Sequence, residues 1–255
     1  MLKLITSLSI AALVSLTVLG SAQASEGAIE LKSGNFKHGG LFGTYDRAAA
    51  QRGLQVYREV CAGCHGLKRV AFRTLMDLGF SEDEVKAIAA SYEFTDGPDK
   101  DGEMFQRPGK PFDKFPSPFA NENAARASNG GALPPDLSLI AKARHDGDDY
   151  IYSVLTGFED APAGFEVPEG KHYNAYFPGH NIAMPPPLSD DSVEYSDGTK
   201  ATLDQEAHDV SVFLTWAAEP KMEQRKQTGL KVILFLLVLA GIFYAVKRKV
   251  WSDIH

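Results

Sequence analysis

The stretch VCAGCHGL, Val60 to Leu67, contains both cysteines of the 255-residue chain, and a histidine directly follows the second cysteine. A Cys-x-x-Cys-His run can bind a metal ion, exchange disulfides or carry a covalently attached haem. Structural zinc normally requires four ligands, commonly from two cysteine pairs, but this chain has a single pair. A thioredoxin-like redox motif belongs to a βαβ pattern, whereas this run ends an amphipathic helical pattern over residues 46–64. Metal binding and disulfide exchange are therefore weaker interpretations of this run than haem attachment.

Attachment of haem c uses all three residues of the motif. The sulfurs of Cys61 and Cys64, expected one helical turn apart, would bond to the two vinyl groups of the porphyrin. His65 follows the second sulfur and would be an axial ligand of the iron. The motif therefore predicts one covalently bound haem c.

The second axial ligand decides the chemistry, because a methionine raises the reduction potential and suits electron transfer, whereas an open position suits catalysis. Besides Met1, the candidates are Met76, Met104, Met184 and Met222. Met76 follows His65 too closely to reach the opposite haem face. Met222 is expected beside a C-terminal membrane anchor, described below, and away from the core. Met184 precedes three prolines, which force it into an extended conformation and stiffen the segment that presents it. We predict Met184 as the ligand, with Met104 and His180 as its rivals.

The two ends of the chain predict export and anchoring. Residues 1–24 have the pattern of a cleaved signal peptide: Lys3, an apolar stretch, and the small-x-small sequence Ala22-Gln23-Ala24. A second apolar run, residues 230–246, approaches the roughly 20 residues needed to span a bilayer. The basic residues 247–249 then place the C-terminus in the cytoplasm.

These signals divide the chain into four expected parts. They are a signal peptide (residues 1–24), a periplasmic cytochrome c domain (25–228), a transmembrane helix (229–247) and a cytoplasmic tail (248–255). The expected location is the inner membrane of a bacterium. The formal charge is −7, and leaving out Lys3 and the net +3 of residues 230–255 gives −11 for residues 25–229. Such an acidic surface argues against nucleic acid as a partner.

The hydrophobic periodicity predicts a mostly α fold. Helices are expected over residues 46–64, after a capping box at Ser81, and over residues 122–128, 148–156 and 203–218. Residues 95–118 and 157–188 are rich in Gly and Pro and show no strong strand pattern, and a polar connector, residues 221–228, precedes the membrane helix. Loops this long are unusual around an ordinary core, and they are expected here to wrap a large cofactor.

With these residues assembled, the chain resembles the cytochrome c1 family, the haem subunits of cytochrome bc1 complexes. The resemblance spans about residues 41–251. The matching runs are RGLQVYREVCAGCH (52–65), DGPDKDGEMFQRPGK (96–110), AARASNGGALPPDLS (124–138), YFPGHNIAMPPP (176–187) and WAAEP (216–220).

The resemblance implies that Cys61 and Cys64 carry the haem and that His65 and Met184 are its axial ligands. It also places Asn129, Arg144 and Tyr150 in the haem pocket, with Arg144 near a propionate. The expected fold is an enlarged class I cytochrome c domain with long loops and one C-terminal transmembrane helix.

Two further positions match the class I pattern, in which a Gly and an aromatic residue precede the first Cys by eight and four residues. Gly53 and Tyr57 occupy these positions and are expected to let the first helix cross the last one closely, against Phe213 or Trp216. Some bacterial members carry an additional Cys pair, which this chain lacks. Its haem loops must therefore be stiffened by packing and proline.

The function that the resemblance implies is electron transfer within a respiratory or photosynthetic chain. The haem would take single electrons from a Rieske iron–sulfur protein and pass them to a soluble or membrane-anchored cytochrome c. Quinol oxidation would belong to cytochrome b in the same complex, which is expected to be dimeric. Acidic stretches at residues 96–103, 146–149 and 190–197 are candidates for steering a cationic partner.

Two other functions remain compatible with the motif. A stand-alone anchored cytochrome would shuttle electrons without a quinol-oxidising complex, but such a protein usually has a small domain on a long flexible linker. A haem enzyme such as a peroxidase would need an open or displaceable second axial position. Carbon monoxide binding to the ferrous form would distinguish this enzyme from an electron carrier.

Overall fold

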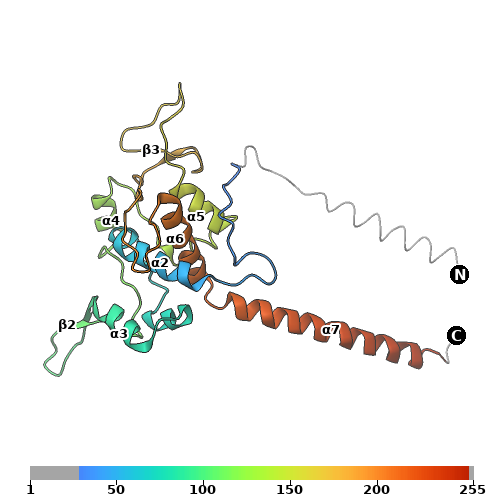
Figure 1. The fold of residues 1–255 in the computed structure, drawn as a ribbon. Helices are drawn as coiled ribbons and strands as arrows, with labels where there is room; N and C mark the ends of the chain where they lie inside the picture. Colours follow the sequence, from blue (N-terminus) through green and yellow to red (C-terminus); the bar gives the residue numbers. More distant parts are fainter. Residues whose placement is uncertain (1–28, 253–255) are drawn as a thin grey trace. The chain divides into compact units, whose positions relative to one another are not determined.

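The described part of the chain, residues 29–252 of a computed structural model, is mostly helical (Figure 1). The predicted signal peptide and the last three residues of the predicted tail lie outside the described residues. The α-helices are α2 (Arg47–Glu59), α3 (Glu82–Ala90), α4 (Glu122–Ser128), α5 (Gly147–Leu155), α6 (Leu203–Ala218) and α7 (Met222–Val250). Three short 3-10 helices are η1 (Cys61–Gly63), η2 (Phe72–Leu78) and η3 (Leu137–Leu139). The predicted class, mostly α with a C-terminal apolar helix, is confirmed.

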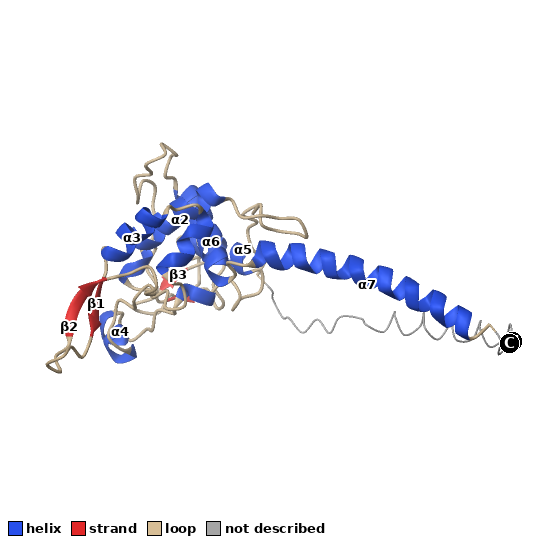
Figure 2. Ribbon diagram, turned by 90° about the horizontal axis from the view of Figure 1, so that it is seen from below, coloured by secondary structure: helices blue, strands red, loops and turns tan. Residues whose placement is uncertain are grey.

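Two small hairpins lie in or overlap the stretches that the sequence predicts as irregular, residues 95–118 and 157–188, and strand β1 begins two residues before the first of them. Strand β1 (Glu93–Asp96) pairs antiparallel with β2 (Phe105–Pro108), and β3 (His172–Tyr173) pairs with β4 (Asn181–Ile182) (Figure 2). The strands have two to four residues, and their side chains are mostly exposed or half-buried. These strands are too short for an alternation of apolar and polar residues to be recognised in the sequence.

The helix before the Cys-His run ends earlier than predicted. Its N-cap is Asp46, whose side chain accepts a hydrogen bond from the Ala49 amide, but its last residue is Glu59 rather than Cys64. Residues 61–63 then form a 3-10 turn in which the Cys64 amide donates to the Cys61 carbonyl at 3.1 Å. The tighter turn replaces the last helical turn that the apolar spacing suggested.

The other helix ends follow the sequence signals closely. Ser81 and Glu84 form the predicted capping box of α3, and the Asn121 side chain caps α4. Helix α6 has the predicted bounds, and α5 begins one residue earlier than expected, after Asp146. Side-chain oxygens at the N-cap accept hydrogen bonds from amides that the helix leaves unpaired, so the starts of α3, α4 and α6 are encoded locally. Asp146 makes no such bond to α5.

Helices α2 and α6 cross at Gly53, in the centre of the core. A Cβ atom at this position would lie 2.0 Å from the Asp209 carbonyl oxygen and 2.8 Å from Cβ of Phe213. One turn later on α2, the Tyr57 ring lies 5.9 Å from the Phe213 ring, centroid to centroid. The predicted close crossing against Phe213 is therefore confirmed, and it depends on the missing side chain of Gly53.

A buried ion pair joins the same two helices. Asp209 on α6 is fully buried and accepts two hydrogen bonds from the Arg52 guanidinium, from Nε at 2.7 Å and Nη2 at 3.1 Å. A bidentate pair of this kind fixes both distance and orientation. It therefore holds α2 and α6 in one register beside the Gly53 contact.

Helix α7 is continuous from Met222, so residues 222–228 of the expected connector are part of the helix. It contains an 18-residue window with a mean hydropathy of 2.4, none of it buried within the chain, and it is long and apolar enough to cross a membrane. The expectation that Met222 lies away from the core is wrong. Its side chain is only 5% exposed and belongs to the hydrophobic core, because the first turn of α7 packs against the domain.

Ionic contacts fix that first turn of α7. The Glu223 carboxylate accepts hydrogen bonds from Nη1 and Nη2 of Arg47 at 2.7 and 2.8 Å, and from the Tyr45 amide at 2.7 Å. Lys226 Nζ donates to the carbonyls of His38 at 2.7 Å and Gly43 at 3.2 Å. Segment 38–47 is thereby tied to α7 at two successive turns.

The Glu223 contact predicts a pH dependence of α7 docking. Its hydrogen bond with Arg47 is the main reason why the pKa of Glu223 lies below its ordinary value, which is about 4.3. A folded-state pKa that is lowered stabilises the docked state above the unfolded pKa, and the gain is lost as pH falls through the folded pKa. We expect the amides of residues 223–227 to lose hydrogen-exchange protection below about pH 4, after correction for the intrinsic exchange rate.

The matched variant for this experiment is Glu223→Gln, which should exchange faster at neutral pH and show a weaker pH dependence. Some dependence should remain, because Glu219 is paired with Arg225 and Lys142 and its pKa is also lowered. Identical protection profiles in the two proteins would contradict a role for the Glu223 carboxylate.

Candidate functional site

The Cys-His run forms a tight turn directly after α2. The amides of Cys64 and His65 both donate to the Cys61 carbonyl, at 3.1 and 2.9 Å, and the Tyr57 hydroxyl donates to the His65 carbonyl at 3.1 Å. The two thiols are not bonded to each other. Burial raises the pKa of the Cys61 thiol to about 12, whereas Cys64 is exposed. Both sulfurs are available for bonds to another group.

The orientation of His65 favours metal ligation. Its Nδ1 lies 2.8 Å from the carbonyl oxygen of Pro135, and because a carbonyl can only accept, Nδ1 must carry the proton. Nε2 of the neutral ring then keeps its lone pair, which is the arrangement found in metal-ligating histidines. Burial lowers the pKa of His65, so the ring is kept neutral.

Sequence reasoning missed Pro135, which lies 70 residues away from His65. Its segment is held against the Cys-His turn by the Leu137 amide, which donates to the Gly66 carbonyl at 2.9 Å. The Asp136 carboxylate also accepts from the amides of Lys68 and Ser138, each at 3.0 Å. No side-chain pattern reports the position of a backbone carbonyl, so the sequence contained no signal for this partner.

Met184 is half-buried and follows strand β4 in a bend that leads into three prolines. Its loop is organised by Asn174, a fully buried residue that sequence reasoning also missed. The Asn174 side chain donates to the Val154 carbonyl at 2.8 Å and accepts from the amides of Tyr176 and Phe177 at 3.0 and 3.1 Å. The loop that presents Met184 is therefore stiffened by hydrogen bonds as well as by proline.

The rival ligands occupy less suitable positions. Met76 and Met104 are 48% and 59% exposed, and Met222 is packed into the core. The His180 Nδ1 lies 3.2 Å from the Asn174 carbonyl, which leaves its Nε2 free as in His65, but the face of the ring is stacked on Tyr173 at 5.6 Å within its own loop. Met184 remains the predicted ligand.

The structure brings two of the three remaining pocket candidates together. The Arg144 guanidinium lies 5.8 Å from the centre of the Tyr150 ring and donates to the Ala143 carbonyl. Within residues 29–252 it has no carboxylate partner, so it can neutralise an acidic group of a ligand. Asn129 ends α4, where its side chain donates to the Ala125 carbonyl at 2.7 Å, and it shares no described hydrogen bond or ring contact with the other two.

These side chains fit a c-type haem better than another metal centre. Two thiols that are not bonded to each other, a neutral imidazole with a free Nε2, a thioether on a stiff loop and a guanidinium without a described carboxylate partner match the vinyl groups, iron and propionates of haem. No group of three or more His, Cys, Asp or Glu residues within residues 29–252 could hold a metal ion. The zinc interpretation therefore finds no ligand set in this part of the chain.

Comparison with known proteins also indicates a haem protein. Residues 36–254 match the Cytochrome C1 family. The chain belongs to the cytochrome c1 family. Membership of this family implies a haem cofactor and confirms the predicted resemblance.

Similar cytochrome c1 proteins occur in bacteria and in mitochondria. The chain is 52% identical over 261 residues to "Cytochrome c1" of Rhodospirillum rubrum, covering 96% of each chain. It is 50% identical over 259 residues to "Cytochrome b/c1" of Bradyrhizobium diazoefficiens, covering 93% of this chain and 38% of that one. It is 52% identical over 232 residues to "Cytochrome b-c1 complex catalytic subunit, mitochondrial" of Candida albicans, covering 91% and 81%.

Proposed function

We propose that this chain is the cytochrome c1 subunit of a bacterial bc1 complex, transferring single electrons from a Rieske iron–sulfur protein to a soluble or membrane-anchored cytochrome c. The observation that carries the proposal is the match of residues 36–254 to the Cytochrome C1 family. The His65 tautomer, set by the Pro135 carbonyl beside two thiols that are not bonded to each other, supports haem ligation. The names of the relatives, which include a fused b/c1 protein and a b-c1 complex subunit, support assembly with cytochrome b.

In this proposal each residue of the site has a defined task. Cys61 and Cys64 hold one haem c by thioether bonds, which supplies a ferric–ferrous couple when bound. His65 would bind the iron through Nε2, and the Pro135 carbonyl would keep its ring from rotating. Met184 would be the second iron ligand, and its thioether would raise the potential and exclude exogenous ligands. Arg144 compensates a propionate charge, and Asn129 and Tyr150 line the pocket.

The proposed placement of the chain follows its ends. After cleavage of residues 1–24, the haem domain faces the periplasm and α7 crosses the inner membrane, leaving Lys247, Arg248 and Lys249 on the cytoplasmic side. Quinol oxidation would reside in cytochrome b, and the complex would be dimeric. The chain alone would then make and break no substrate bond.

Covalent attachment predicts a simple chemical signature. The purified chain should have a mass equal to that of residues 25–255 plus one haem, and the haem should stay with the polypeptide after denaturation in acidified acetone. Cys61→Ala combined with Cys64→Ala should abolish this retention, because no other cysteine exists in the chain. A haem that extracts freely from the unsubstituted protein would contradict the thioether bonds.

The function is tested by solubilising membranes in mild detergent and purifying a tagged copy of the full chain. Co-purification of b-type haem and a Rieske protein, with reduction of the c haem by quinol, is the expected result. A c haem that arrives alone and is inert to quinol would overturn the proposal. Carbon monoxide binding would then decide between a free electron shuttle and a haem enzyme such as a peroxidase.

A further inference from the structure

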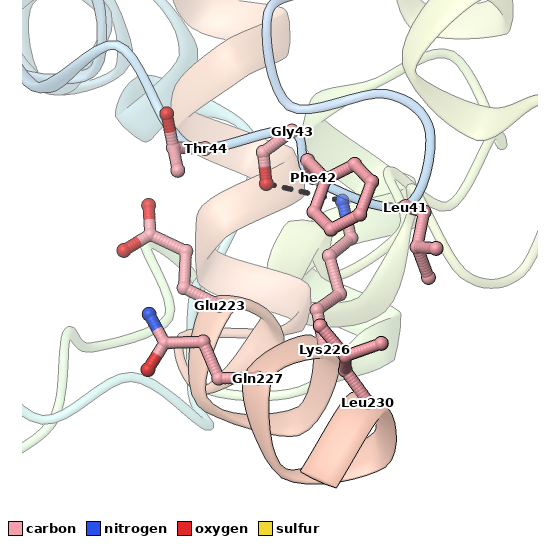
Figure 3. A pocket seen from close by; sticks show the side chains of 8 residues that line it. All are labelled: Leu41, Phe42, Gly43, Thr44, Glu223, Lys226, Gln227 and Leu230. Carbon is pink, nitrogen blue, oxygen red and sulfur yellow. Dashed lines mark hydrogen bonds between the residues drawn. The ribbon is translucent and has the colours of Figure 1, made fainter. Parts of the chain in front are cut away.

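A groove of about 180 Å³ lies where segment 41–44 meets the first turns of α7 (Figure 3). Its lining residues are Leu41, Phe42, Gly43, Thr44, Glu223, Lys226, Gln227 and Leu230. Two of them are large apolar side chains turned to solvent: Phe42 is 77% exposed and Leu41 is 58% exposed. Leu230, at the far end of the groove, is the first residue of the apolar run of α7.

This loop is rigidly connected to α7 although 180 residues separate them in the sequence. Lys226 Nζ donates to the carbonyls that flank the loop tip, those of His38 and Gly43 (Figure 3 draws the second bond). One turn earlier on α7, Glu223 binds Arg47 and the Tyr45 amide just after the loop. The position of α7 in a membrane therefore determines the position of Leu41 and Phe42.

The start of the apolar run of α7 sets the depth of the loop. The 29 residues of α7 extend about 43 Å at 1.5 Å per residue, which is enough to cross the roughly 30 Å hydrocarbon core of a bilayer and to leave the first turn of α7 packed against the domain. Because the apolar run begins at Leu230 and one headgroup layer is only about 5–7 Å deep, roughly the last turn before Leu230, residues 226–229, lies within that layer. Leu230 then marks the boundary between headgroups and acyl chains, and the groove places Leu41 and Phe42 beside it.

We propose that Leu41 and Phe42 insert into the headgroup–acyl boundary of the membrane and form a second lipid contact beside α7. The chemistry fits, because exposed apolar side chains at this depth lose contact with water when lipid covers them, and interfacial amphipathic helices bury Phe and Leu side chains at this same boundary. The molecule that covers the exposed side chains of Leu41 and Phe42 is therefore phospholipid rather than a further protein subunit. The inference rests on the proposed anchoring by α7.

The experiment is photo-crosslinking of the full-length chain in native membranes. Benzoylphenylalanine replaces Phe42, a position whose exposure makes the substitution harmless to folding. After illumination, mass spectrometry of the peptide that contains position 42 identifies what the side chain touched. The expected result is a phospholipid adduct. The matched control is the same replacement of Phe112, which is 56% exposed but does not line the groove, and it should give no lipid adduct.

The anchor itself is tested by placing benzoylphenylalanine, in separate variants, at Phe235, Leu237 and Val238. These three positions point in different directions around α7. Lipid adducts there, with none at position 42 or with a protein adduct at position 42, would overturn the loop insertion and leave the anchor intact. Absence of lipid adducts at all three positions of α7 and at position 42 would overturn the membrane anchoring as well. An equal lipid yield at positions 42 and 112 would show non-specific labelling and would also overturn the proposal.

Discussion

Met184→Leu is expected to lower the reduction potential of the haem by a few tenths of a volt, because axial ligands set haem potentials over a range of about 0.8 V. A thioether stabilises ferrous iron relative to ferric iron, and leucine has a similar size but no donor atom. The vacated position should also let the ferrous protein bind carbon monoxide. Potentiometric titration and visible spectra of the purified complex, with and without carbon monoxide, measure both effects.

The control for this variant is Met104→Leu, the strongest rival among the methionines. Met104 is 59% exposed, so its replacement should leave the potential and the carbon monoxide response unchanged. If the effects appeared in the Met104 variant and not in the Met184 variant, the ligand assignment would be wrong. If neither variant changed the potential, His180 would be the next candidate.

Gly53→Ala is expected to destabilise the haem domain by about 3 kcal/mol, as overpacking in a close-packed core does. Helix propensity alone predicts the opposite, since alanine in a helix is about 1 kcal/mol more favourable than glycine. The added Cβ would lie 2.0 Å from the backbone oxygen of Asp209, however, and α6 cannot yield there without also disturbing the Arg52–Asp209 pair. The steric cost therefore exceeds the gain in helix propensity. The sign of the change in the free energy of unfolding shows which of the two effects dominates.

Chemical unfolding of the full chain in detergent, followed by haem absorbance, measures this effect. Gly229→Ala is the matched control, because it lies inside α7 and a Cβ there would meet nothing within 4 Å. Its unfolding midpoint should be unchanged or slightly raised, because alanine is the better helix former and no clash opposes it. A stabilised Gly53→Ala protein would mean that α2 and α6 do not pack as closely as the structure shows.

Much of the candidate site is a prediction from local sequence, because its chemistry depends on side-chain types and their spacing. The spacing of Cys61, Cys64 and His65 predicts the haem attachment, and the prolines after Met184 distinguish it from the other methionines. The helix boundaries at Ser81 and Asn121 were predicted correctly for a related reason: a capping side chain acts on amides two or three residues away. The end of α2 was not, because nothing in the apolar spacing distinguishes a last α-turn from a 3-10 turn.

The sequence by itself determined the class of the protein: a helical domain with a Cys-His haem motif and one apolar C-terminal helix. Only the tertiary structure decided which contacts hold these parts in position. It supplied the Pro135 carbonyl that orients His65, the Asn174 side chain that stiffens the Met184 loop, and the Glu223–Arg47 contact that docks α7. Each of these is a hydrogen bond whose partner is a backbone group or lies more than a hundred residues away. Local patterns encode the ends of helices and the kind of ligand, whereas contacts of this sort exist only after the chain has folded.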